Sequence, residues 1–242
     1  MDKRSKISFT VKPVGDCAVL AVFGDTVDEN TSAAVTVLER LLKDAKLPGV
    51  GETIPAFASL LIHYDPLDTD YRTVADTLIG LQIDFGSKDH TENRTVNIPV
   101  CYGGEYGEDL PFVARHSGMS EEEVIALHSG RTYRIYMLGF LPGFPYLGGL
   151  DERLFTPRLS DPRTKIPAGS IGIGGEQTGI YPLESPGGWQ LIGRTPLTLF
   201  DPEKGGNLPY RAGDFIRFVP IDADEFKAME AASKKGASVN GD

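Results

Sequence analysis

Residues 167–196 read PAGSIGIGGEQTGIYPLESPGGWQLIGRTP, and this stretch decides the fold of the second half of the chain. Glycine is entropically costly inside a helix and proline lacks the backbone donor, so a segment this rich in both excludes long helices. The surrounding residues 131–220 hold 15 Gly and 11 Pro, and short apolar runs such as 170–173 and 215–219 lie between them. This pattern predicts a barrel or sandwich of short strands.

The residues before this region show a different pattern. Apolar side chains alternate over 7–11 and form short runs over 18–23 and 58–64, as expected for strands. Apolar residues at helical spacing follow at 35–45 and 71–81. We therefore predict a small α+β domain in this part of the chain.

The polar, turn-forming stretch 86–93 contains no apolar period and predicts a linker between two domains. We expect an α+β domain over residues 1–90, a β-barrel domain over 94–222 and a flexible C-terminal tail over 227–242, where Ala, Ser, Lys and Gly dominate. This tail is expected to begin as a fraying helix and to end in disorder. Within the second domain, the motif SEEE at 120–123 has the spacing of a capping box and predicts the start of a helix.

Charge and composition exclude several classes of protein. The 242 residues carry a formal net charge of -10, which opposes tight binding to a phosphate backbone, so we expect no nucleic-acid partner. No segment approaches the roughly 20 consecutive apolar residues that span a bilayer, and the N-terminus lacks the apolar centre of a signal peptide. These features predict a cytoplasmic protein that does not bind membranes. Only Cys17 and Cys101 are present, so no disulfide framework is indicated.

The chain lacks the common motifs of a self-contained catalytic site. Its four His are scattered without zinc-ligand spacing, so we expect no metal. It has no phosphate-binding loop, the Gly-rich run 169–175 departs from the dinucleotide fingerprint, and Ser170 does not lie in a nucleophile elbow. The catalytic residues therefore stay unassigned. Such a chain suits either an enzyme subunit that completes its site with a partner or a binding module.

Residues 133–149, YRIYMLGFLPGFPYLGG, carry the first candidate binding residues. The rings of Tyr136, Phe140, Phe144 and Tyr146 alternate with Pro and Gly that make tight turns. One interpretation is a rigid turn that presents aromatic rings at a surface. The other is an ordinary barrel core with tight corners, and residue types alone do not separate the two.

The 167–196 stretch adds polar groups in a Gly-dense loop, where close approach of a ligand is sterically possible. Amide, hydroxyl and indole groups suit recognition of an amide or lactam, although each can also satisfy a local turn. A guanidinium can clamp a carboxylate or phosphate, and an exposed surface position is the alternative for each Arg. The candidates are Gln177, Thr178, Tyr181, Ser185 and Trp189, with Arg158, Arg163 and Arg194 as the nearby cations.

Three strings carry a resemblance to a known family: MLGFLPGFPYLGGL at 137–150, the stretch 167–196, and AGDFIRFVP at 212–220. They are similar to the family that contains the B subunit of 5-oxoprolinase (PxpB), the KipI kinase inhibitor and the proteins labelled allophanate hydrolase subunit 1. The similarity covers nearly the whole chain and is looser in the N-terminal half. Gly174 stands where relatives often carry Ala.

The resemblance implies a cyclophilin-like barrel and a hydrolase subunit of a hetero-oligomer, with the larger C subunit (KipA-like) and the A subunit of 5-oxoprolinase as partners. The assembled 5-oxoprolinase uses ATP to open 5-oxo-L-proline to L-glutamate, and this chain has no ATP motif. Two alternatives stay open. One is a KipI-like inhibitor of sensor histidine kinase autophosphorylation, with the turn Phe144-Pro145-Tyr146 as its contact. The other is a subunit of an allophanate- or urea-processing enzyme.

Overall fold

The computed structural model of the protein describes three ranges of residues: 8–25, 29–81 and 94–234. Contacts within the chain divide it into two compact units, residues 1–92 and 93–242. The predicted linker 86–93 lies outside the described residues. Each unit has its own hydrophobic core, as expected of a domain.

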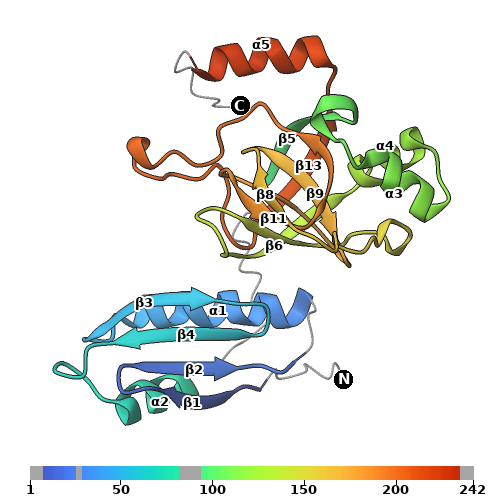
Figure 1. Ribbon diagram of the computed structural model, residues 1–242. Helices are drawn as coiled ribbons and strands as arrows, with labels where there is room; N and C mark the ends of the chain where they lie inside the picture. Colours follow the sequence, from blue (N-terminus) through green and yellow to red (C-terminus); the bar gives the residue numbers. More distant parts are fainter. Residues whose placement is uncertain (1–7, 26–28, 82–93, 235–242) are drawn as a thin grey trace. The chain divides into compact units, whose positions relative to one another are not determined.

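The first unit is built on one antiparallel sheet with the strand order β1-β2-β4-β3 (Figure 1). Its elements are β1 (Thr10–Val14), β2 (Ala18–Val22), α1 (Glu29–Ala45), β3 (Val50–Pro55), β4 (Ser59–Tyr64) and α2 (Tyr71–Gly80). Alternate strand residues such as Val19 and Ile62 are buried on one face. Leu38 of α1 and Leu78 of α2 belong to the same core cluster, which places both helices on that face.

The second unit holds a closed barrel (Figure 1), which confirms the β-barrel predicted for this half. The strand order in this barrel is β10-β7-β6-β13-β5-β12-β9. The barrel strands are β5 (Thr95–Tyr102), β6 (Thr132–Leu138), β7 (Pro145–Gly148), β9 (Ser170–Gly174), β10 (Gln177–Ile180), β12 (Gln190–Arg194) and β13 (Phe215–Pro220). Neighbouring strands run antiparallel except β5 and β13, the first and last of the barrel, which run parallel.

Short elements surround the barrel. They are η1 (Gly104–Tyr106), α3 (Leu110–Ser117), α4 (Glu121–Ser129), η2 (Glu152–Leu154), β8 (Arg163–Ile166), β11 (Ser185–Gly187), η3 (Pro202–Lys204) and α5 (Ala223–Lys234). Strands β8 and β11 pair as a separate two-stranded ribbon. Helix α4 begins with the predicted capping box, in which Ser120 and Glu123 each accept from the backbone N–H of the other.

The C-terminal segment begins with a helix. Residues 227–234, where a fraying helix was expected, belong to α5, and residues 235–242 of the predicted tail lie outside the described residues. Phe226 is 3% exposed, and its ring centroid lies 4.3 Å from that of Tyr106. This apolar contact holds the helix on its unit. The Ala- and Lys-rich composition of this segment is favourable for a helix.

One polar network lies inside the barrel. His128 of α4 is fully buried, with Nδ1 2.8 Å from the Tyr102 hydroxyl and Nε2 2.9 Å from Oγ1 of Thr178. The Thr178 hydroxyl donates its single proton to the Gly172 carbonyl oxygen at 3.1 Å, so toward His128 it accepts. The neutral ring therefore carries its proton on Nε2 and accepts from Tyr102 at Nδ1. Thr178, a predicted binding residue, thus faces the barrel interior.

This network predicts a pH-dependent stability. Burial lowers the pKa of His128 to about 3, because a charged ring inside the barrel would lose its hydration. In the unfolded chain the pKa of His is ~6.5, so below that pH the unfolded state binds a proton at this residue while the native ring stays neutral. The free energy of unfolding therefore falls as the pH drops. We expect this residue to lower the free energy of unfolding, measured with urea, by about 2 kcal/mol between pH 7 and pH 5.

Two variants separate this effect from other titrations. His128→Gln removes the titrating ring, so its free energy of unfolding should be lower at pH 7 but should change less between pH 7 and pH 5. His116→Gln, at an exposed position of α3, is the matched control and should keep the pH dependence of the unsubstituted chain. The same decrease in His128→Gln as in the unsubstituted chain would refute a neutral buried ring.

Candidate functional site

The Gly-rich strands β9 and β10 separate two layers of apolar side chains. One layer is the barrel core, which includes Ile171, Ile173 and Ile180. Because strand side chains alternate, the positions between them face the outer side of the barrel wall, and these are Gly172, Gly174 and Gly179. Against this bare outer surface lies a second cluster, named here the aromatic cluster: Phe144, Ile166, Tyr181, Trp189 and Leu191.

The Trp189 indole lies directly on these glycines. A Cβ atom at Gly174 would overlap the indole ring, and a Cβ at Gly179 would lie 3.0 Å from Cζ3 of Trp189 and 3.1 Å from Cζ of Phe144. The ring occupies this position because the strands have no side chains there.

The aromatic rings pack edge to face. The centroid of the Phe144 ring lies 5.5 Å from that of Tyr181 and 5.6 Å from that of Trp189, each pair at an interplanar angle of 77°. Tyr146 lies 5.3 Å from Phe144, and Phe140 lies 5.7 Å from it, at 65° and 83°. This geometry brings the positive edges of the rings to negative ring faces, which stabilises the arrangement.

A cavity of about 150 Å³ opens beside the aromatic cluster. Its walls consist of aromatic rings, two glycines and one cation: Phe140, Phe144, Tyr146, Arg158, Tyr181, Gly187, Gly188 and Trp189. The guanidinium carbon of Arg158 lies 5.8 Å from the Trp189 ring centroid, a cation–π contact. Burial raises the pKa of Tyr181 to about 12, although the charge of Arg158 opposes this rise. The Tyr181 hydroxyl is therefore protonated at neutral pH.

The loop between β6 and β7 holds Phe140 at the wall of this cavity in a strained conformation. Its φ of 65° lies in the left-handed region, which is unfavourable for a residue with a side chain, and Phe140 is 67% exposed. The N–H of Gly139 donates to the Phe144 carbonyl at 3.1 Å, and the Tyr210 hydroxyl donates to the Gly143 carbonyl at 2.9 Å. An exposed ring held against backbone strain is typical of a binding surface.

The structure divides the predicted binding residues into two groups. Those that line the cavity are Phe140, Phe144, Tyr146, Arg158, Tyr181 and Trp189. Those that do not are Tyr136, Arg163, Gln177, Thr178, Ser185 and Arg194.

The two other predicted arginines have partners within the chain. The Nη2 atom of Arg163 lies 2.8 Å from Asp109 and its Nε atom lies 3.0 Å from Glu108, so Arg163 fastens β8 to the start of α3. The Nε atom of Arg194 donates to the carbonyl of Ala168 at 3.1 Å. Neither guanidinium lies in the cavity wall, so sequence proximity to the motif did not distinguish them from Arg158.

The remaining predicted residues lie on strands of the barrel unit, outside the cavity wall. Tyr136 is buried on β6, where its ring covers Gly148. Gln177 is half-buried at the start of β10. Ser185 is buried on β11, and its hydroxyl has no hydrogen-bond partner among the described residues.

Sequence reasoning missed two wall residues, Gly187 and Gly188. A Cβ atom at Gly187 would lie 2.7 Å from the Tyr181 hydroxyl and from Cδ1 of Ile166, so only glycine leaves room for the ring beside it. The signal was present in the sequence, because consecutive glycines directly precede the sole Trp of the chain. The Gly density of 167–196 indicated that a ligand could approach the backbone closely, but these two glycines were not named as candidate residues.

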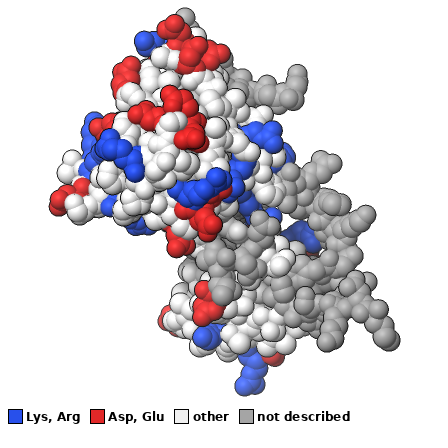
Figure 2. Space-filling view, turned by 90° about the vertical axis from the view of Figure 1, so that its right-hand side faces the viewer, with Lys and Arg blue, Asp and Glu red and all other residues white. Residues whose placement is uncertain are grey.

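Metal-binding clusters and membrane-spanning helices are both absent from the described part of the chain. Within the ranges 8–25, 29–81 and 94–234, no group of three or more His, Cys, Asp or Glu side chains is placed to hold a metal ion. None of the helices described in these ranges is long and apolar enough to cross a membrane. On the face shown in Figure 2, acidic and basic side chains are intermixed over the described surface.

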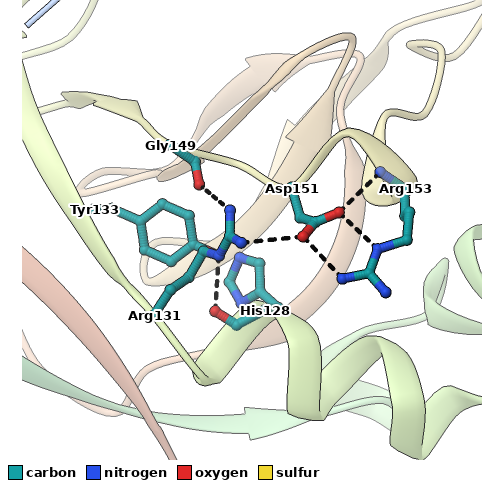
Figure 3. Close-up of polar contacts among 6 residues, drawn as sticks. All are labelled: His128, Arg131, Tyr133, Gly149, Asp151 and Arg153. Carbon is teal, nitrogen blue, oxygen red and sulfur yellow. Dashed lines mark hydrogen bonds and ion pairs between the residues drawn. The ribbon is translucent and has the colours of Figure 1, made fainter.

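A second polar cluster, shown in Figure 3, lies beside the start of β6 and the end of β7. Phe140 lies in the loop at the other end of this hairpin. Asp151 accepts from Nη2 of Arg131 at 3.0 Å and from Nε of Arg153 at 2.9 Å, and Arg131 also donates to the Gly149 carbonyl at 2.6 Å. These contacts, chiefly the hydrogen bond from Arg153, lower the pKa of Asp151. The cluster fastens the chain after β7 to the start of β6, which is a structural role.

Residues 9–209 match the protein family described as carboxyltransferase domain, subdomain C and D. The chain belongs to this family. It is 41% identical to the B subunit of 5-oxoprolinase from Bacillus subtilis over 241 residues, which cover 94% of this chain and 99% of that protein. Every residue of the cavity wall lies inside the range that matches the family.

Two further proteins are similar to this chain to different degrees. The solved structure of an uncharacterized protein from Pyrococcus horikoshii is 47% identical, with a TM-score of 0.54, and the match covers 90% of this chain and 100% of that one. The urea amidolyase of Saccharomyces cerevisiae is 26% identical over 95% of this chain and 14% of that much longer protein.

The position of Trp189 can be tested through Gly174. We expect Gly174→Ala to displace the indole and to lower the free energy of unfolding by about 1–3 kcal/mol, because the added methyl group overpacks the contact. Trp189 is the only Trp of the chain, so the displacement should also shift the emission maximum of the folded protein. Gly80→Ala, where a Cβ atom would meet nothing within 4 Å, should leave the emission unchanged. Identical emission in both variants would contradict the seating of the indole on β9.

The strain at Phe140 predicts a reversed order of stability. At ordinary φ values Ala is more stable than Gly, whereas at φ 65° Gly is favoured. We therefore expect Phe140→Gly to exceed Phe140→Ala in free energy of unfolding by about 1 kcal/mol. Both variants lack the ring, so the loss of its contacts cancels in the comparison. Urea unfolding of the two proteins measures the difference, and greater stability of the Ala variant would exclude the strain.

Proposed function

We propose that this chain is the B subunit of an ATP-dependent 5-oxoprolinase, which opens 5-oxo-L-proline to L-glutamate together with the A and C subunits. The observation that carries the proposal is the 41% identity to the B subunit of the Bacillus subtilis 5-oxoprolinase, which covers 99% of that protein. Similarity at this level along the whole length supports a shared role. We also infer that the barrel is cyclophilin-like and that the assembly is cytoplasmic.

ATP supplies the energy of the proposed reaction. A five-membered lactam is a stable, poorly electrophilic amide, and transfer of a phosphoryl group from ATP to its carbonyl oxygen would make the carbonyl carbon open to attack by water. The ring nitrogen would then leave as the amine, and hydrolysis of the resulting acyl phosphate would release phosphate and glutamate. The cavity of this chain does not fit ATP, because it measures about 150 Å³ and pockets for drug-sized ligands span roughly 300–1,000 Å³. Arg158 would also be the sole cation of the wall opposite three phosphate groups. We therefore assign no ATP-dependent step and no catalytic residue to this chain.

The exposed side of the cavity is suited to contact with a partner subunit. Phe140 is 67% exposed in a conformation that costs free energy, so a contact made by this ring would offset that cost. Aromatic rings are also enriched at interfaces between subunits. We infer that the C subunit, the larger partner, covers the cavity at Phe140 and completes the reaction site there.

A second candidate is a subunit that processes urea or allophanate. Two observations favour it: the carboxyltransferase description of the family and the 26% identity to a urea amidolyase. The match covers only 14% of that enzyme, so most of its length has no counterpart here. Choice of substrate separates the two candidates.

Reconstitution tests the proposed function directly. Co-expression of this chain with the A and C subunits should yield ATP hydrolysis that depends on 5-oxo-L-proline and forms glutamate, and omission of this chain should abolish it. Phosphate release and glutamate formation are measured on the same assembly, with urea and allophanate as alternative substrates. Turnover with urea or allophanate and none with 5-oxo-L-proline would refute the proposal and favour the second candidate.

A further inference from the structure

Arg158 is the single charged residue in the wall of the cavity. Among the described residues no carboxylate pairs with it, and its guanidinium lies over the Trp189 ring. Arg163, by contrast, is neutralised by Asp109 and Glu108. A guanidinium over an aromatic face keeps its planar fork of N–H donors for an anion. The cavity therefore combines walls of aromatic rings with one cation that lacks an anionic partner among the described residues.

The volume of the cavity matches one small ring. A cavity of about 150 Å³ lined by apolar side chains is large enough for benzene, and this cavity has the same volume. Its walls are flat rings set edge to face around Phe144, so a flat five- or six-membered ring can lie against them. With Arg158 in the wall, the best-matched ligand is a single ring that carries one carboxylate.

We propose that this cavity is the binding site of 5-oxo-L-proline itself, with the carboxylate on Arg158 and the lactam ring against Phe144 and Trp189. The inference rests on the proposed function and deepens it, because it places the substrate on this chain and not on the partner subunits. Among the reaction's participants, 5-oxo-L-proline is the one that has both a single ring of this size and a single carboxylate.

Tyr181 supplies the polar group that a lactam needs. Its hydroxyl lies beside Gly187, because a Cβ atom there would be 2.7 Å from that oxygen, and both residues line the cavity. A protonated hydroxyl donates one hydrogen bond and accepts others, so it can donate to the lactam carbonyl or accept from the lactam N–H. Tyr181 is thus a positioning residue for the ring, whereas Arg158 selects the carboxylate.

The sole Trp of the chain provides a direct readout of binding. Titration of the full-length chain with 5-oxo-L-proline should change the fluorescence of Trp189 saturably. We expect 2-pyrrolidinone, the same ring without the carboxylate, to bind at least about 10-fold more weakly, because it lacks the charge-assisted hydrogen bonds to Arg158. No saturable change with 5-oxo-L-proline would overturn the proposal.

Variants of two arginines test the role of Arg158. Arg158→Gln should raise the dissociation constant of 5-oxo-L-proline at least about 10-fold and leave that of 2-pyrrolidinone nearly unchanged. Arg153→Gln is the matched control, because this Arg pairs with Asp151 away from the cavity, and it should bind both ligands as the unsubstituted chain does. An equal affinity for 5-oxo-L-proline in Arg158→Gln and the unsubstituted chain would overturn the inference.

The assembled enzyme separates failure of this inference from failure of the proposed function. In an active assembly, Arg158→Gln should raise the KM for 5-oxo-L-proline about 10-fold and change kcat less than about twofold, because the lost contact lies away from the reacting amide. An unchanged KM in an assembly that hydrolyses ATP with 5-oxo-L-proline would overturn the site and leave the proposed function standing. Arg158-dependent binding in an assembly without such turnover would support the site and refute the proposed function.

Discussion

The contact between the Trp189 indole and the glycines of β9 and β10 is the constraint on which the surface of the barrel unit depends. Ile171 and Ile173 fill the barrel from one side of the strand, and the glycines between them leave the other side bare. One stretch of backbone therefore serves two apolar layers. Without this bare surface the aromatic cluster would stand farther from the wall, and the cavity beside it would have a different shape.

The barrel and its helix caps were accessible from local sequence patterns, because Gly and Pro density and the 120–123 capping box act over a few residues. The aromatic block 133–149 had two interpretations, a turn at the surface and a barrel core, and the structure contains both. Phe144 is 2% exposed and belongs to the aromatic cluster, whereas Phe140, four residues earlier, is 67% exposed. Residue type does not distinguish them, since the difference lies in the backbone of the loop.

The candidate site was harder to predict, because its membership depends on contacts between distant parts of the chain. Thr178 forms a hydrogen bond with His128, 50 residues away in the sequence, and Arg163 pairs with Asp109, 54 residues away. Both looked like binding residues in the sequence because their eventual partners lie outside any local window. The contact of Phe226 with Tyr106 likewise joins segments far apart in the sequence.

The parallel pairing of β5 with β13 makes the barrel unit complete only at its last strand. Thr95 faces Phe215, and the Asp214 carboxylate accepts from the backbone N–H of Arg94 across 120 residues. During synthesis, β13 leaves the ribosome only after nearly the whole unit, so β5 lacks this neighbour until then. Such long-range closure slows folding and leaves strand edges open in the meantime. A chain ending before β13 would thus present two unpaired barrel edges, which favours aggregation.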